Sequence, residues 1–436
     1  MSGVDRSRLG AAGSTVAGRT LHGASRRLAR FSWAVVVALA LCVTFIRKRA
    51  GAWPFVFVVF GVSRLVFFVA GGLAVALLPE ARPPDELRDA PRTLGYWANW
   101  DGAWYAEISG EGYAGSRSPT STVFFPLYPL LVRGVASVLP GSLVTSGGAV
   151  SLVAALAGLF FVYRIAEEIY DEKAARAATL AMAFFPTAFF FNAFYTEALF
   201  LALSAGTVWA ALVRRNLLLA GVLGGLAAAT RNPGVLLLIP LGYEWLRGRD
   251  EFGLRGLACL GLVPMGLVAY VGFLWARFGE PLIFVHEQTT YWGRGFRSPI
   301  LTLDYAWRTA VWGADHFLHP ARLFIAQAPD YAFEASNVVN LVFLAVFLYL
   351  AGACLLGLPP GLSLYALVLV SQPILAPSSY VPLMSMPRFV LAAFPVFLIA
   401  GFLLSRTRYG LAVYLIASSA AGIFLVSLFT TYRWVA

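Results

Sequence analysis

The chain has 436 residues, of which 59% are hydrophobic and only 13% are charged, with a formal net charge of +11. Soluble domains carry about 25% charged residues, so this composition excludes an ordinary soluble domain. Apolar runs that approach the ~20 residues a helix needs to cross hydrocarbon recur along the chain, and the arginines fall between them. We therefore predict an all-α polytopic membrane protein, and interpret the basic excess as a sign of membrane topology rather than of nucleic-acid binding.

The first 51 residues are separated from the rest as a basic N-terminal tail with a short apolar segment. Residues 1–30 are rich in Gly, Ser and Arg and are predicted to be disordered. Residues 31–46 are apolar but shorter than a full span. We interpret them as a cytoplasmic or interfacial segment, with a twelfth span as the alternative.

Residues 52–436 are predicted to form one transmembrane domain with about eleven helices. The predicted spans are 53–78, 143–163, 177–194, 197–213, 216–230, 233–246, 256–276, 336–356, 361–377, 388–404 and 409–429. Lys and Arg are concentrated in alternate short connections, which predicts that these connections face the cytoplasm. The two large loops, 79–142 and 277–335, are then extracytoplasmic.

Polar residues gather at helix ends and in loops on this predicted outer face. They are Trp100, Asp101, Glu107, Glu111, Tyr195, Glu197, Arg231, Asn232, Arg294, Arg297, Tyr380 and Arg388. A transporter more often places such residues on broken helices near the middle of the membrane. The pattern therefore favours chemistry at the boundary between the membrane and the outside.

Each candidate also has a structural interpretation. Asp101 can cap a short helix by accepting the Trp104 N–H. Arg231 and Arg388 can anchor span ends by reaching toward the membrane surface. Arg64 lies in the middle of a predicted span and should have an interior partner, because a buried Arg is costly in hydrocarbon.

Metal and cofactor motifs are not indicated. His316 and His319 are spaced i, i+3 but have no third ligand at helical spacing. The sequence contains no GxGxxG, Walker or GxSxG motif. The three cysteines lie far apart in apolar runs and predict neither a disulfide nor a metal site. We therefore predict no metal and no nucleotide cofactor.

Several stretches together resemble the PIG-V type mannosyltransferases, which add the second mannose to GPI-anchor precursors, and their bacterial relatives. The most specific is WDGAWYAEISGEGY (100–113), followed by VFFPLYPLLVR (123–133). FNAFYTEALFLALSAG (191–206), LLLAGVLGGLAAATRNPGVLLLIP (217–240) and MSMPRFVLAAFPVFLIAG (384–401) are similar in order and placement.

The resemblance covers about residues 52–430 and implies the GT-C class of integral membrane glycosyltransferases. Members carry an essential acid in the first large outer loop, which identifies Asp101 as the general base of an inverting transfer. Their donors are lipid-phosphate sugars, here a polyprenyl-phosphate mannose, so neither nucleotide nor obligatory metal is needed. Arg388 and Arg231, with Arg294 and Arg297 in reserve, are expected to hold the phosphate. Trp100, Glu107, Tyr195, Glu197, Asn232 and Tyr380 are the further expected substrate contacts.

An Arg-rich, Lys-poor composition suggests a high-GC bacterium, so the expected location is its plasma membrane, with the active site outside. Bacteria lack GPI anchors, so the acceptor is left open between a glycolipid, a polysaccharide and a protein. Two alternatives stay open. One is a GT-C enzyme that uses another lipid-linked sugar, and the other is a non-catalytic flippase or polysaccharide transporter.

Overall fold

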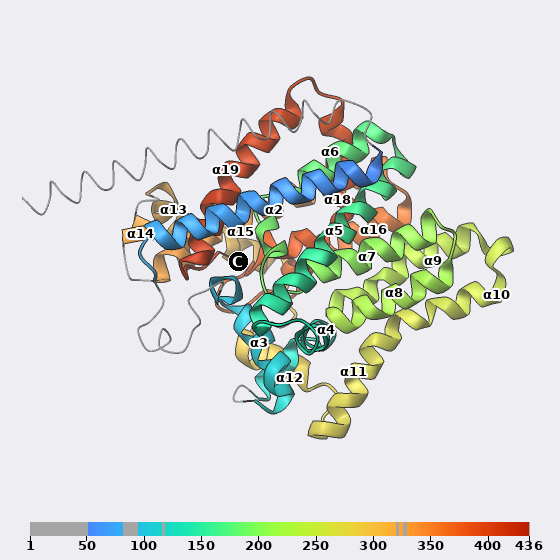
Figure 1. The fold of residues 1–436 in the computed structure, drawn as a ribbon, viewed down its shortest axis with the longest axis horizontal. Helices are drawn as coiled ribbons and strands as arrows, with labels where there is room; N and C mark the ends of the chain where they lie inside the picture. The colour runs from blue at the N-terminus through green and yellow to red at the C-terminus, as the bar shows by residue number, and fades with distance from the viewer. Residues whose placement is uncertain (1–50, 82–94, 116–117, 320–321, 326–328, 436) are drawn as a thin grey trace, which may run out of the picture. The chain divides into compact units, whose positions relative to one another are not determined.

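The computed structural model describes residues 51–81, 95–115, 118–319, 322–325 and 329–435. The predicted tail, including the apolar segment 31–46, lies outside the described residues. Within the described ranges every regular element is helical (Figure 1), which confirms the predicted all-α class.

The longer helices are separated by short turns of 3-10 helix. In chain order the helices are α2 (Ala52–Leu77), α3 (Asp101–Glu111), α4 (Leu127–Ala136), α5 (Leu143–Ile169), α6 (Glu172–Ala183), α7 (Glu197–Leu212), α8 (Leu217–Thr230), α9 (Leu238–Arg247), α10 (Arg249–Leu260), α11 (Leu262–Phe278), α12 (Ile283–Trp292), α13 (Pro299–Leu318), α14 (Arg322–Ile325), α15 (Pro329–Gly357), α16 (Pro360–Leu375), α17 (Met386–Phe389), α18 (Phe394–Ser405) and α19 (Gly410–Thr430). The 3-10 turns are η1 (Gly95–Ala98), η2 (Gly112–Ala114), η3 (Thr120–Val123), η4 (Ala188–Phe191), η5 (Asn232–Leu237) and η6 (Val390–Ala392).

Five segments are long and apolar enough to cross a membrane by themselves. They are Ala52–Leu77, Leu143–Ile169, Arg249–Phe278, Tyr331–Gly357 and Gly410–Thr430. A sixth is formed if Met386–Ala392 and Phe394–Ser405, which are bent by 84° against each other, count as one span. The chain is thus a multi-pass membrane protein, as predicted, while the number of eleven spans stays a prediction.

Three predicted spans differ from the observed helices where prolines occur. The predicted span 233–246 starts as η5, which contains Pro233, and is α-helical only from Leu238. The predicted span 177–194 is helical only to Ala183, and the chain then turns through Pro186 into η4. The predicted span 388–404 begins its long helix at Phe394, after the short α17 and η6. Proline favours a helix start and lacks the N–H that a helix interior requires. Apolar composition alone did not distinguish a buried turn from a helix.

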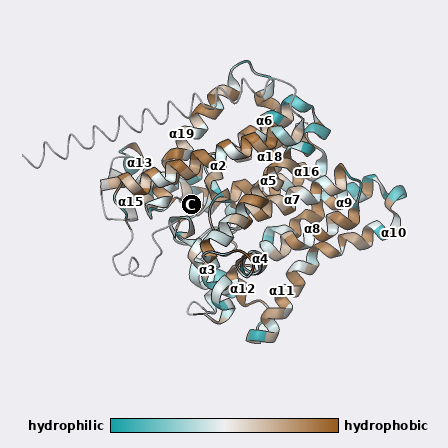
Figure 2. Cartoon of the chain, in the orientation of Figure 1, coloured by the Kyte–Doolittle hydropathy of each residue, from teal (hydrophilic) through white to brown (hydrophobic). Residues whose placement is uncertain are grey.

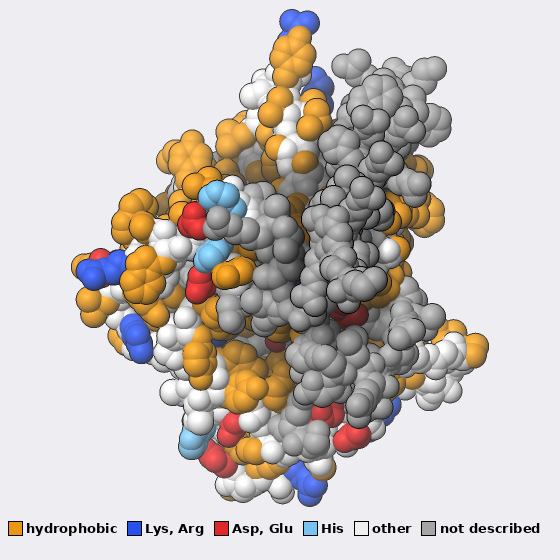
Figure 3. All heavy atoms as spheres, turned by 90° about the vertical axis from the view of Figure 1, so that its left-hand side faces the viewer, with side chains coloured by type: hydrophobic (Ala, Val, Ile, Leu, Met, Phe, Trp, Pro, Cys, Tyr) orange, Lys and Arg blue, Asp and Glu red, His pale blue; other side chains and the backbone are white. Residues whose placement is uncertain are grey.

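The predicted outer loops contain helices of their own. Loop 79–142 includes α3 and α4, and loop 277–335 includes α12 and the 20-residue α13. Trp307, Trp312 and Leu301 of α13 are exposed. Hydrophobic side chains are spread widely over the face in Figure 3, as expected for a surface that contacts lipid.

The most extensive helix contacts join helices that are close in sequence, with the pair of α6 and α18 as a long-range exception. α5 lies along α7, α6 along α18, and α13 along α15, while α8 contacts both α7 and α11 (Figure 1). A Cβ added at Gly266 of α11 would lie 1.8 Å from the Gly225 carbonyl oxygen of α8, so this contact requires glycine, as is common between membrane helices. Hydrophilic residues gather around α6, α10 and α3, and the helices between them are mostly hydrophobic (Figure 2).

Arg64 of α2 has the interior partners that its mid-span position predicts. Its guanidinium donates to the carbonyl oxygens of Ala183 (2.7 Å) and Ala188 (2.5 Å) and to Asn192 Oδ1 (2.8 Å). Asn192 in turn donates to the Arg64 carbonyl at 3.1 Å. This arginine therefore fixes the turn between α6 and α7 against α2.

Candidate active site

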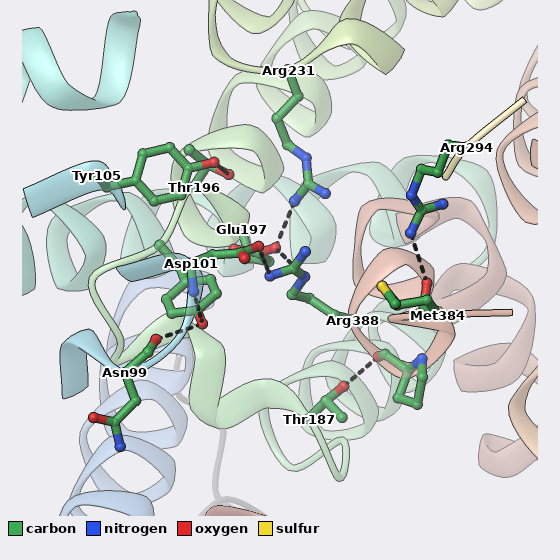
Figure 4. A network of polar contacts seen from close by, with 12 residues as sticks. Asn99, Asp101, Tyr105, Thr187, Thr196, Glu197, Arg231, Arg294, Met384 and Arg388 are labelled. Carbon is green, nitrogen blue, oxygen red and sulfur yellow. Dashed lines mark hydrogen bonds and ion pairs between the residues drawn. The ribbon is translucent and has the colours of Figure 1, made fainter. Parts of the chain in front are cut away.

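Asp101 is the first residue of α3, and its carboxylate does not cap that helix. The N-cap is Trp100, which has a φ of 58°. The Asp101 side chain instead accepts a hydrogen bond from Arg388 Nη1 at 2.5 Å (Figure 4). The capping interpretation of Asp101 is therefore wrong, and the acid is directed at a residue 287 positions later in the chain.

Tyr195 holds the backbone beside Asp101. Its hydroxyl donates to the Asn99 carbonyl at 2.8 Å and accepts from the Asp101 N–H at 3.1 Å. The Asn99 side chain donates to the Phe429 carbonyl at 2.9 Å. Burial, with the nearby charge of Asp101 added, raises the pKa of the Tyr195 phenol. Because this hydroxyl donates to one group and accepts from the other, Tyr195 positions Asp101, and the predicted contact to a sugar hydroxyl stays a prediction.

Arg388 links the acid to a second carboxylate. It lies on α17, after Ser385, whose φ is 67°. Arg388 Nε lies 3.3 Å from Glu197 Oε1, at the start of α7. Glu197 Oε1 also accepts from Arg231 Nη1 at 2.7 Å, and Arg231 is the C-cap of α8. Four segments distant in sequence thus form one chain of ion pairs, and the anchoring interpretation of the two arginines is not supported.

Arg294 adds a third guanidinium to this cluster. It follows α12 and donates from Nη2 to the Met384 carbonyl at 3.0 Å (Figure 4). The guanidiniums of Arg231, Arg294 and Arg388 lie 5.6, 5.1 and 5.4 Å from the centre of the Phe389 ring. Burial and the charge of Arg388 lower the pKa of Arg294 to about 10. Three arginines face two carboxylates, so the cluster is net positive and suited to an anion.

Two polar atoms of the cluster are buried without a hydrogen bond among the described residues. They are Nε of Arg388 and Oε2 of Glu197. The Glu197 side chain is only 2% exposed and that of Arg388 10%. Buried polar atoms are nearly always paired in folded proteins. Arg388 Nε has Glu197 Oε1 as an ion-pair partner at 3.3 Å, so the atom left over is Glu197 Oε2, an acceptor that could bind a hydroxyl donor.

Trp100 belongs to an aromatic group next to the acid. Its ring stacks on Tyr432 with 4.6 Å between centroids and meets Trp434 edge-on at 5.1 Å. Tyr432 also has a positive φ, 62°. The four non-glycine residues with positive φ in the described ranges are Trp100, Arg215, Ser385 and Tyr432. Three of them border the ion pairs, and such conformations cluster at functional sites.

The remaining predicted contacts lie away from the ion pairs. Glu107 is near the other end of α3, beside Gly115. Asn232, Arg297 and Tyr380 are exposed, and the described hydrogen bonds and ion pairs connect none of them to Asp101 or Arg388. Sequence reasoning missed Asn99 and Tyr432 as supports of the site. The only available signal was their position beside tryptophans, in NWD and TYRW.

The two histidines singled out in the sequence pair with single acids. His316 Nε2 lies 2.9 Å from a Glu334 carboxylate oxygen, and His319 Nδ1 lies 3.3 Å from Asp315. Within the described ranges, no group of three or more His, Cys, Asp or Glu side chains is placed to hold a metal ion.

An apolar groove of about 750 Å³ runs between α3 and α4 on one side and α8 and α11 on the other. Its walls include Ile108 of α3, Tyr113 of η2, and Leu226 and Ala229 of α8. Ala229 lies two residues before Arg231. The groove therefore extends along α8 to within a helical turn of the ion-pair cluster.

Comparison with known proteins connects part of the chain to a glycosyltransferase family. Residues 121–268 match the family model of the dolichyl-phosphate-mannose-protein mannosyltransferases. The match covers 148 of the 436 residues and includes Glu197 and Arg231 but neither Asp101 nor Arg388. A search of curated protein sequences finds no match.

Solved structures show distant likenesses. ArnT from Cupriavidus metallidurans in the apo state is 13% identical over 81% of this chain and 78% of its own, with a TM-score of 0.37. The same protein bound to undecaprenyl phosphate is 16% identical over 86% and 78%, with a TM-score of 0.36. The Archaeoglobus fulgidus oligosaccharyltransferase, complexed with Zn and sulfate, is 14% identical over 84% and 53%, with a TM-score of 0.36. The present chain thus spans about half the length of that enzyme, and at these TM-scores no functional conclusion follows.

Proposed function

We propose that this chain is a membrane glycosyltransferase that moves a sugar, most simply mannose, from a polyprenyl-phosphate donor to an acceptor hydroxyl with inversion. The observation that carries this proposal is the contact of Asp101 with a buried, net-positive cluster of three arginines. The proposed base, Asp101, is thus adjacent to the arginines that would hold the phosphate, and the reaction requires both groups at one site. The match of residues 121–268 to a mannosyltransferase family supports the same class.

The residues divide the chemistry between them. Asp101 takes the proton of the acceptor hydroxyl while its oxygen attacks the anomeric carbon. The bond between that carbon and the phosphate oxygen breaks, and its electron pair leaves with the lipid phosphate. Arg388, Arg231 and Arg294 hold the phosphate charge, because a guanidinium fork can engage phosphate through two parallel hydrogen bonds. A lipid phosphate already leaves readily, so the proposal includes neither nucleotide nor obligatory metal.

The lipid part of the donor has a place beside this site. A substrate phosphate near Arg231 would bring its first isoprene units to the apolar groove along α8. Burying them there is favourable at about 25 cal/mol per Å². We place the site on the extracytoplasmic side of a bacterial plasma membrane, on the distribution of Lys and Arg. The acceptor is a glycolipid, polysaccharide or protein of the envelope.

The test uses the purified protein in nanodiscs, radiolabelled polyprenyl-phosphate mannose and a membrane-lipid extract as the acceptor pool. Wild type is expected to form a labelled product and Asp101→Asn none, while Glu111→Gln, the same charge change at the far end of α3, keeps activity. Transfer by Asp101→Asn would contradict the role of the acid. A panel of other lipid-phosphate sugars decides the donor, and no transfer from any of them would contradict the function and favour a transporter.

A further inference from the structure

We propose that Arg388 is shared in turn by Asp101 and the donor phosphate, so that donor binding releases the base. This inference rests on the proposed function and adds an order to it. While Arg388 binds Asp101, the acid is engaged, and once Arg388 binds the donor phosphate, the acid is free to activate an acceptor.

The contacts of Asp101 carry the first step of the inference. Its Oδ2 accepts a short charge-assisted hydrogen bond from Arg388 Nη1, at 2.5 Å. Such bonds are about twice as strong as neutral ones. The bond uses one of the roughly four lone-pair sites of the carboxylate and fixes the direction in which the acid points. Asp101 is therefore aimed at Arg388, and a change of partner at Arg388 would let it turn toward an acceptor hydroxyl.

The second step is that a contact between Arg388 and a phosphate would be favourable. Arg388 Nε is buried and makes no hydrogen bond among the described residues, with Glu197 Oε1 as an ion-pair partner at 3.3 Å. The neighbouring Arg231 and Arg294 already surround the same Phe389 ring. An anion placed among the three would gain three cationic partners, whereas the Asp101 carboxylate contacts one. A phosphate thus competes with Asp101 for Arg388 on favourable terms.

The third step is that Arg388 can change partner without leaving the site. Glu197 lies on its other side, with 3.3 Å between Nε and Oε1, and is nearly fully buried. Arg231 holds the same Oε1 at 2.7 Å. These contacts keep the guanidinium in the cluster, while a rotation about its own axis redirects Nη1. No covalent bond changes in this step, and the proton transfer follows it.

Competition for Arg388 predicts a gain of affinity in Asp101→Asn that depends on Arg388. The probe is undecaprenyl phosphate, titrated into nanodiscs that hold wild type or a variant. Asp101→Asn removes the competing charge, so it is expected to bind the probe roughly tenfold more tightly, which is about 1.4 kcal/mol. Glu111→Gln makes the same change of net charge at the exposed end of the same helix and is expected to bind like wild type.

A double variant completes the cycle. Asp101→Asn combined with Arg388→Gln is expected to lose the gain, because the competition acts only through Arg388. Thermal unfolding of each variant in the same nanodiscs identifies loss of binding that comes from misfolding. An affinity of Asp101→Asn equal to or weaker than that of wild type would overturn the inference, as would a gain that survives in the double variant.

The outcomes also separate this inference from the function beneath it. If wild type transfers sugar and binds the probe, but Asp101→Asn shows no gain, the sharing of Arg388 is wrong and the function stands. If wild type neither binds the probe nor transfers any lipid-linked sugar, the function and the inference both fail.

Discussion

Two buried arginines, Arg64 and Arg388, are close in their degree of burial and differ in what surrounds them. The Arg64 guanidinium contacts neutral oxygens, two from backbone carbonyls and one from Asn192. Arg388 lies between the carboxylates of Asp101 and Glu197 and is ion-paired with both. The first arginine is held by neutral groups, and the second by two charges.

The kind of partner, neutral oxygens for Arg64 and carboxylates for Arg388, distinguishes a structural charge from a functional one. A guanidinium whose N–H groups are occupied by fixed carbonyls gains nothing from a ligand. A guanidinium that is held by carboxylates can exchange one of them for an anion that enters the site. Burial alone would have assigned both arginines the same importance, and only their partners distinguish them.

The largest effect is expected at the acid itself. Asp101→Ala should lower the transfer rate by about 10²–10⁴-fold, the usual contribution of a general base. The loss of folded protein should be much smaller than the loss of rate, because Asp101 caps no helix and Arg388 keeps Glu197 as a charge partner. Single-turnover transfer, measured beside a thermal unfolding curve, checks both parts. If the amount of folded protein fell as much as the rate, the role of Asp101 would be structural, like that of Arg64.

At Arg64 we expect a loss of stability instead of a loss of catalysis. Arg64→Met should lower the free energy of unfolding by about 3 kcal/mol, because several buried oxygens lose their donor at about 1–3 kcal/mol each. Arg388→Met should disturb folding less and donor binding more. Melting temperatures in detergent and donor titrations of both variants test the comparison directly. Equal melting temperatures for the two variants would remove the distinction.

A smaller effect is expected where the site is held in position. Tyr195→Phe removes the hydroxyl that bridges Asn99 and the Asp101 N–H, so the acid loses its fixed orientation. We expect roughly a tenfold fall in kcat, a small part of what orientation can contribute, with an unchanged donor KM. A rise in KM with constant kcat would instead indicate a direct contact between Tyr195 and the substrate.

The smallest effect concerns the pH dependence of donor binding. The pKa of Arg294 is lowered to about 10, so its charge is complete below that pH and is lost above it. Donor affinity should therefore fall a few-fold as the pH rises through 10, and the fall should vanish in Arg294→Gln. The effect of Arg294 on folding stability runs in the opposite direction. Above about pH 10 the unfolded chain still holds this proton and the folded chain does not, so the group makes the folded state more stable as the pH rises. A fall in donor affinity therefore cannot come from unfolding that is linked to Arg294.

The long helices could be predicted from the sequence because length and hydropathy determine them locally. α2, α5 and α19 lie where apolar runs of at least 20 residues occur. Pro186 is the signal that α6 ends before the predicted span does, but the FFPTAFFF stretch around it is as apolar as a span. Arg64, from a distant helix, stabilises the turn by binding the carbonyls of Ala183 and Ala188, and that contact could not be predicted.

The site was predictable in its residue types and less so in its pairing. The sequence put Asp101, Glu197, Arg231 and Arg388 on one predicted face, but nothing in it indicated that Arg388 is shared by the two acids. Nor could it assign Tyr195 to the backbone of Asn99 rather than to a sugar. Pairings of this kind depend on how α3, α7 and α17 pack, which local patterns do not specify.

The positive φ angles at Trp100, Ser385 and Tyr432 have a practical consequence for anyone who engineers this protein. Backbone conformations of this kind cost L-residues about 1–3 kcal/mol each, and glycine would relieve the strain. Glycine in place of Trp100 or Tyr432 would also remove a packed aromatic ring, a loss of about 3–5 kcal/mol that exceeds the strain relieved. A heat-resistance screen would therefore reward glycine at Ser385, and the clones that it selects would lose the fixed start of α17, on which Arg388 lies.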